Sequence, residues 1–221
     1  RGLFAPLAIV GCFCVPIILE PDYGTTALCG GVGLVLIFLA GANIKWLFSM
    51  FIALASVFCA MVYFNPVRLQ RVLSFLNVEE TKSDGSYQLY QAILAFGNGG
   101  ISGVGIGQGR QQLSFLPEAH TDFVFAIVGE ELGMVCTFLV VALFLALFIA
   151  AIYNIRKAPN LFEFSLATGA MLMIVLQALF NICVVTGLVP TKGISLPFIS
   201  YGGSNLVAMF AFTGLLVNCL R

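Results

Sequence analysis

Six long stretches of this chain are strongly apolar and nearly free of charge, and they limit what it can fold into. They cover residues 2–19, 23–44, 46–67, 132–155, 164–191 and 193–220. Each is long enough to cross about 30 Å of hydrocarbon with about 20 helical residues. A segment in lipid must satisfy its own backbone hydrogen bonds, which favours helices. Only 9% of the 221 residues are charged, whereas a soluble domain carries about 25%. We therefore predict one all-α membrane domain over residues 1–221, a polytopic helical bundle with spans at about 2–19, 25–39, 46–64, 121–153, 164–187 and 204–220.

The beginning of the chain and its cysteines add two expectations. The chain starts without Met and without a signal-peptide pattern, so we expect earlier spans to precede it. All seven cysteines fall inside predicted spans, which indicates small apolar packing residues rather than a disulfide framework. The net charge is zero, and it gives no indication of a nucleic-acid partner.

The placement of basic residues predicts the orientation of the chain. Residues 68–120 form a long polar segment between the third and fourth spans. If this segment is set aside as a large loop, the other basic residues divide five to one between the two sides, and the richer side should be cytoplasmic. Residues 20–24, 68–120 and 190–203 would then lie outside the cytoplasm. Nine of the ten acidic residues lie on that outer side or just below it.

The start of the fourth span gathers an unusual number of acidic residues. Glu118, the only histidine (His120) and Asp122 precede two adjacent glutamates, Glu130 and Glu131. Asp122 can cap the helix, because a carboxylate near a helix N-terminus is stabilised by the helix dipole. A cap, however, explains only one of these carboxylates.

Helical spacing predicts that Asp122, Ala126 and Glu130 share one face, with Glu130 about 12 Å further along the helix. The small side chain of Ala126 would leave room there for a partner or for water. An ionisable group at that depth is costly unless it faces protein, water or a partner. Glu131 would point about 100° away, so the two glutamates need not share a role.

Residues 97–110 contain seven glycines in fourteen positions. One interpretation is a flexible loop. The other is a backbone that comes close to a bulky ligand and donates N–H groups to phosphate. The run lacks a strict G-x-G-x-x-G pattern after a strand, so a dinucleotide-binding fold is not supported.

The third polar element is PTKGISLPFISYGGSN, residues 190–205. Lys192 is its only cation, and it could pair with an anionic ligand or with Asp122. Such a loop is tolerated at membrane depth where it is buried in protein or lines a wet cavity. The lone histidine and the lack of a G-x-S-x-G frame argue against a serine hydrolase, and no zinc site has credible ligand spacing. The loop's other candidate residues are Ser200, Gly202, Gly203 and Ser204.

Four motifs together resemble the SEDS family, which includes FtsW, RodA and SpoVE. They are EPDYGT (20–25), GQGRQQLSFLPEAHTDF (107–123), GEELG (129–133) and PTKGISLPFISYGGSN (190–205). The family has about ten spans, so the resemblance implies that this chain corresponds to the C-terminal six. PEAHTDF with Ala119, together with PTKG, looks more like the FtsW division branch than the RodA branch.

The resemblance implies a peptidoglycan glycosyltransferase of the bacterial cytoplasmic membrane, which polymerises lipid II at the outer face and releases undecaprenyl diphosphate. Its partners would be a class B penicillin-binding protein and other division proteins. Asp122 matches the essential aspartate of the family and would be the general base. Lys192 and Arg110 would bind diphosphate, and Glu118 and His120 would orient the acceptor or bind Mg²⁺ or Mn²⁺.

Other roles follow less directly. The resemblance implies no organic cofactor, and Asp22 would be structural, bonding to the top of the second span. Two rival functions remain open: a flippase for lipid-linked precursor and a non-catalytic scaffold for division proteins. A flippase needs polar groups through both leaflets, whereas the acidic residues here crowd the outer side.

Overall fold

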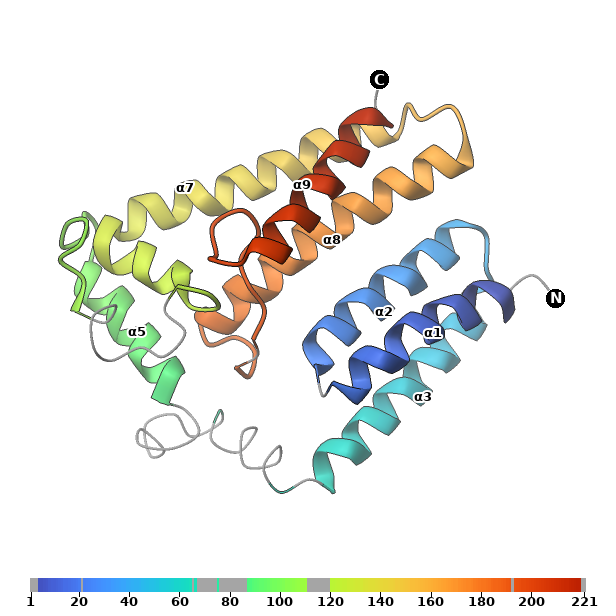
Figure 1. Cartoon of the computed structure of the whole chain (residues 1–221), viewed down its shortest axis with the longest axis horizontal. Coiled ribbons are helices and arrows are strands. Elements are labelled where there is room, and N and C mark those ends of the chain that lie inside the picture. The colour runs from blue at the N-terminus through green and yellow to red at the C-terminus, as the bar shows by residue number, and fades with distance from the viewer. Residues whose placement is uncertain are drawn as a thin grey trace. The chain divides into compact units, whose positions relative to one another are not determined.

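The computed structural model describes residues 4–20, 22–64, 66, 75, 87–110, 120–191 and 193–219. Their regular structure is entirely helical, which confirms the all-α prediction for this part of the chain. Helices occupy all six predicted segments, with ends within three residues of those expected. The helices are α1 (Phe4–Leu19), α2 (Tyr23–Leu39), α3 (Ile44–Tyr63), α5 (Tyr87–Gly99), α7 (Val124–Ile155), α8 (Leu161–Val185) and α9 (Gly203–Asn218) (Figure 1).

Two of the described helices, α7 and α8, are long and apolar enough to cross a membrane. Helices α1, α2 and α9 are also apolar but have 16 or 17 residues each. The side chains that α7 leaves exposed are mainly large and apolar, among them Phe138, Leu139 and Leu143. Such a surface suits contact with lipid or with further helices better than contact with water.

The chain divides into two compact units, and helices α7, α8 and α9 contribute to both. The first unit comprises Arg1–Val62, Phe148–Leu176 and Phe210–Arg221. Within it α1 and α2 pack closely, because a Cβ at Gly33 would come 2.8 Å from the side chain of Val10. Asp22 is the N-cap of α2, where its Oδ1 accepts from the N–H of Thr25 at 3.1 Å.

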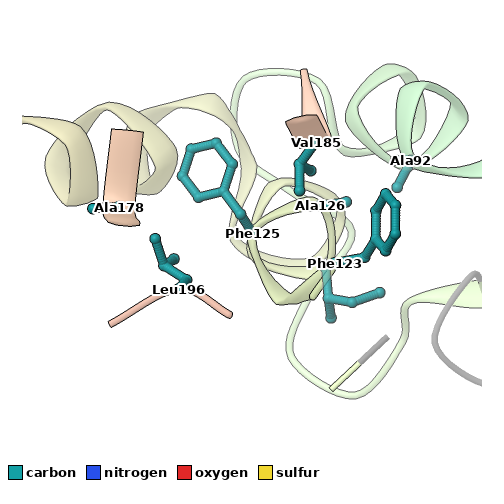
Figure 2. Close-up of a cluster of buried hydrophobic side chains, with 9 residues drawn as sticks. Ala92, Phe123, Phe125, Ala126, Ala178, Val185 and Leu196 are labelled. Carbon is teal, nitrogen blue, oxygen red and sulfur yellow. The ribbon is translucent and has the colours of Figure 1, made fainter. Parts of the chain in front are cut away.

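The second unit comprises Tyr63–Leu147 and Gln177–Met209 and contains most of the candidate site residues. Its core surrounds the first turn of α7. In Figure 2 the side chain of Phe123 lies on the same side of α7 as Ala92. The side chain of Phe125 lies on the opposite side of α7, where Ala178 and Leu196 also lie. The core consists of Ala92, Ala95, Phe123, Phe125, Ala126, Ile127, Ala178, Val185 and Leu196.

Helix α7 is broken at Gly133, although the sequence predicts an uninterrupted span. Gly133 has φ 78° and ψ −175°, a conformation open mainly to glycine. In an unbroken helix the N–H groups of Met134 and Val135 would donate to the carbonyls of Glu130 and Glu131. The break therefore leaves two donors and two acceptors without their helical partners. Residues 134–155 alone would extend about 33 Å, which is enough to cross the hydrocarbon layer.

The glycine loop, residues 99–110, supplies partners for all four groups (Figure 1). Two of its carbonyls accept the freed N–H groups, and two of its N–H groups donate to the freed carbonyls. The bonds are Met134 N–H to Gly100 O (3.0 Å), Val135 N–H to Ile101 O (3.4 Å), Val104 N–H to Glu130 O (3.0 Å) and Gly105 N–H to Glu131 O (3.0 Å).

Close backbone contact explains several glycines of this loop. A Cβ at Gly99 would overlap the carbonyl oxygen of Gly129, and one at Gly103 would overlap the carbonyl oxygen of Glu131. The sequence offered a flexible loop or a loop that approaches a bulky ligand. At Gly99 and Gly103 the close approach is made to the backbone of α7, and the approach of the glycine run to a ligand stays a prediction.

Candidate active site

Three consecutive carbonyl groups precede helix α7, and each receives a hydrogen bond from residues 181–201. The carbonyl of His120 accepts from the N–H of Tyr201 at 2.9 Å. The carbonyl of Thr121 accepts from the hydroxyl of Ser200. The carbonyl of Asp122 accepts from the Asn181 side-chain amide at 2.7 Å. Because buried backbone carbonyls need partners, these bonds fix the segment from which the Asp122 side chain projects.

Ser200 holds its own loop together as well as the start of α7. Its Oγ accepts from the buried N–H of Leu196 at 2.7 Å while the hydroxyl donates to Thr121. The Ser200 side chain is only 6% exposed. In the turn between them, Phe198 has φ 65°, the only positive value at a described residue other than glycine. Ser200 was predicted to contact substrate, and the contacts seen are with the protein backbone.

Helix α8 anchors the loop through two amide side chains one turn apart. Gln177 donates to the carbonyl of Ser195 and to Oδ1 of Asn205, both at 2.9 Å. Asn181 donates to the carbonyl of Ile194 at 2.6 Å, in addition to its bond to Asp122. Both amides are buried. The loop from 193 to 205 is thus bound to α8 and to the segment before α7.

The carboxylate of Asp122 lies against the backbone of Gly193. A Cβ at Gly193 would come 2.9 Å from Oδ2 of Asp122. Asp122 itself is half-buried, and it lies two residues before the helix begins at Val124. Asp122 is therefore a half-buried residue on a segment whose backbone is held by hydrogen bonds.

A second group of candidates lies at the break in α7. The carboxylate of Glu130, 1% exposed, accepts from the backbone N–H of Arg110 at 3.1 Å. A Cβ at the adjacent Gly109 would come 2.9 Å from Oε2 of Glu130, so a side chain there would displace this carboxylate. Glu131 is half-buried, and its Oε1 has no hydrogen-bond partner among the described residues. Glu130 thus faces protein, one of the three environments predicted for it.

Ala126 does not leave the room that its small side chain suggested. It is fully buried within the core of the second unit, beside Ala92 and Ala95 of α5. The space next to the Asp122–Glu130 face is therefore filled by the protein itself. Helix α5 supplies this packing through its buried residues, which include Ala92 and Ala95.

The remaining candidates are distributed as follows. His120, Gly203 and Ser204 are exposed, as is the side chain of Arg110. Gly202 is half-buried, and Asp22 belongs to the first unit. Glu118 and Lys192 lie outside the described residues. Among the residues that the structure describes, no three His, Cys, Asp or Glu side chains gather to hold a metal ion.

Three residues of this site, Asn181, Gln177 and Gly193, were not among those predicted from the sequence. The two amides had a recognisable signal, because they stand four residues apart in the apolar second half of α8. Polar side chains at that spacing share a helix face, and in an apolar span they indicate a buried contact. Gly193 had none, since its role depends on a residue 71 positions earlier in the chain.

Substituting Ser200 by alanine should lower the free energy of unfolding by about 2 kcal/mol, because the N–H of Leu196 and the carbonyl of Thr121 lose their partners. Thermal unfolding of the full-length protein in detergent, followed with a thiol-reactive dye, measures the effect. Ser56→Ala is the control, since Ser56 is exposed and bonds only within α3. Equal unfolding midpoints for the two variants would contradict the assigned role of Ser200.

A comparison with known proteins supports the family resemblance that the motifs of this site indicate. The profile of the FtsW/RodA/SpoVE family, described as cell cycle proteins, matches residues 1–221. The chain is 39% identical over 216 residues to a probable peptidoglycan glycosyltransferase FtsW from Geobacter metallireducens, covering 97% of this chain and 58% of that protein. It is 41% identical to the stage V sporulation protein E of Bacillus subtilis, covering 100% and 60% respectively.

A solved structure extends the similarity to the fold. One chain of a peptidoglycan synthase complex that coordinates polymerization and crosslinking matches with a TM-score of 0.75 and 26% identity. The match covers 98% of this chain and 60% of that one. This chain therefore spans about three fifths of the length of these relatives. By its motifs, its helices and these similarities, the chain belongs to the FtsW/RodA/SpoVE family of cell cycle proteins.

Proposed function

We propose that the protein containing this chain is a peptidoglycan glycosyltransferase that polymerises lipid II during cell division. The relative from Geobacter metallireducens carries that enzyme name, and the solved chain of similar fold comes from a peptidoglycan synthase complex. The observation that carries the proposal is Asp122, a half-buried carboxylate on a backbone segment fixed by three hydrogen bonds.

Asp122 acts in this proposal as the general base. A sugar hydroxyl of one lipid II molecule attacks the anomeric carbon of another, and a new glycosidic C–O bond forms. The bond between that carbon and the diphosphate breaks, and undecaprenyl diphosphate leaves with the electron pair. The hydroxyl proton passes to the Asp122 carboxylate. A base held in place by the backbone lowers the entropic part of the barrier.

The substrate is large and anionic, so it requires donors besides the base. Lys192 directly precedes Gly193 in the chain, and Arg110 has an exposed side chain on an anchored backbone. Both would bind the diphosphate and stabilise its growing charge. Glu118 and His120 would orient the acceptor. Ser200, Gly202, Gly203 and Ser204 would form the wall of the binding site through their loop.

The membrane topology of the proposal has six spans and an outer loop over residues 68–120. It places the protein in the bacterial cytoplasmic membrane with Asp122 at the outer face. A class B penicillin-binding protein and other division proteins are the proposed partners. A Mg²⁺ or Mn²⁺ ion would need ligands from Glu118 or the diphosphate, since the described residues offer no ligand cluster. No step of the reaction is assigned to a metal.

A flippase is the main rival, and broken membrane helices are typical of transporters. Here the glycine loop already takes up the four backbone groups freed by the break in α7. A transporter usually leaves such groups for its substrate. This difference favours the polymerase.

The test gives fluorescent lipid II to the full-length protein, purified with its penicillin-binding partner. Glycan ladders on a gel are the expected result. If no ladders form, and lipid II moves across the membrane of liposomes that contain the protein, the flippase replaces the polymerase as the proposed function. The absence of both activities would favour the scaffold.

A further inference from the structure

We propose that Asn181 and Gly193 are positioning residues that hold Asp122 in its reactive place, a proposal that rests on the function above. Neither residue supplies chemistry to the reaction. Asn181 fixes the backbone of Asp122, and Gly193 forms the surface against which its carboxylate lies. Together they determine where the base stands relative to the substrate.

The side-chain amide of Asn181 joins two segments that are far apart in sequence. Its nitrogen lies 2.7 Å from the carbonyl oxygen of Asp122 and 2.6 Å from that of Ile194. Both contacts are acceptors, so the group facing them must be the NH₂, and both of its hydrogens are used. Because one atom makes both bonds, Asn181 sets the distance between the two segments. The residue is 1% exposed, which protects these bonds from competition by water.

Gly193 lies against the side-chain carboxylate of Asp122, whereas Asn181 bonds to the main-chain carbonyl. It directly precedes Ile194, so the bond from Asn181 to Ile194 also fixes the position of Gly193. Its φ is not in the left-handed region, so backbone conformation does not require glycine here. The missing side chain does matter, because a Cβ would come 2.9 Å from Oδ2 of Asp122.

Gln177 provides a matched comparison that separates holding the loop from holding Asp122. It stands one turn before Asn181 on α8, is buried, and bonds to the same loop at Ser195 and to Asn205 in the first turn of α9. Among the described residues, its hydrogen bonds run only to Ser195 and Asn205, and none reaches the segment before α7. A substitution of Gln177 should therefore loosen the loop without releasing the backbone of Asp122.

The kinetic experiment compares Asn181→Ala, Asn181→Asp and Gln177→Ala in the full-length protein with its penicillin-binding partner. Asn181→Ala should lower kcat for lipid II about 10- to 100-fold, because a small misplacement of a catalytic group has effects of that size. KM should change by less than about twofold, since ground-state binding is retained. Asn181→Asp should be equally impaired, because a carboxylate of the same shape cannot donate either bond. Gln177→Ala should lower kcat clearly less than Asn181→Ala does, because it loosens the loop without releasing the backbone of Asp122.

Gly193→Ala tests the second residue, with Gly97→Ala as its control. The new methyl group would displace the Asp122 carboxylate, so kcat should fall about tenfold or more. A Cβ at Gly97 would meet nothing within 4 Å. A Gly193→Ala protein with wild-type kcat would remove Gly193 from the proposal.

Hydrogen exchange read by mass spectrometry gives a result that does not depend on activity. Asn181→Ala should speed exchange in peptides covering both 120–127 and 193–201, whereas Gln177→Ala should affect only 193–205. If Asn181→Ala and Gln177→Ala lose equal amounts of kcat, or show equal exchange in residues 120–127, the positioning role of Asn181 is overturned. A wild-type protein that makes no glycan would overturn the proposed function instead, and the exchange data would still decide whether Asn181 holds the Asp122 segment.

Discussion

Replacing Asp122 by asparagine is expected to slow lipid II polymerisation about 10²- to 10⁴-fold, the usual contribution of a positioned general base. The amide has nearly the shape of the carboxylate but does not accept a proton at neutral pH. The main-chain carbonyl of residue 122, not its side chain, accepts the bond from Asn181. The substitution should therefore remove the base while the segment before α7 keeps its place.

The matched control is Asp22→Asn, because Asp22 also precedes a helix and serves as the N-cap of α2. Asparagine caps helices about as well as aspartate, so this variant should keep both its stability and its polymerising activity. Ladders on a gel and thermal unfolding in detergent are measured for both variants. An Asp122→Asn protein that folds normally and polymerises at the wild-type rate would reduce Asp122 to a helix-terminal carboxylate and place the base elsewhere.

The helices of this protein follow from its sequence because lipid imposes a simple requirement. A long apolar run in hydrocarbon must form its own backbone hydrogen bonds, so length and composition are enough to predict a helix. The ends of α1, α2 and α8 accordingly lie close to the predicted ones. Asp122 could be singled out for a similar reason, since a charged residue at the mouth of an apolar run is costly without a purpose.

Backbone pairing between distant segments could not be predicted in the same way. The glycines at 99 and 103 indicated close approach to something, but any nearby backbone or ligand would satisfy that pattern. Only the structure shows that their neighbours are Gly129 and Glu131. The break at Gly133 was equally hidden, because a single glycine in an apolar run is compatible with a continuous helix.

The sequence could single out candidate site residues but not the contacts that hold them. His120 and Asp122 stood out because the chain has one histidine and few acids. Asn181 did not, because an amide in a span has many roles and its importance comes from two carbonyls that it happens to reach. Residue type can indicate which groups carry chemistry, whereas the groups that hold them depend on tertiary contacts.

Substituting Gly99 by alanine is expected to destabilise the protein by about 3 kcal/mol or more, the upper range for overpacking a tight contact. The new Cβ would overlap the carbonyl oxygen of Gly129 and come 2.8 Å from Cα of Glu130. Both are backbone atoms, so no side chain can rotate away. Helix α5 would have to separate from α7, and the bonds of the glycine loop to Glu130 and Glu131 would be weakened with it.

Gly97→Ala on the same helix should have the opposite sign. A Cβ there would meet nothing within 4 Å, and alanine favours a helix over glycine by about 1 kcal/mol. The two variants of the full-length protein differ only in which face of α5 carries the methyl group, so their unfolding midpoints isolate the contact with α7. If Gly99→Ala were as stable as Gly97→Ala, α5 would not be seated on the backbone of Gly129. That result would also contradict the pairing of the glycine loop, which begins at Gly99, with the backbone groups at the break in α7.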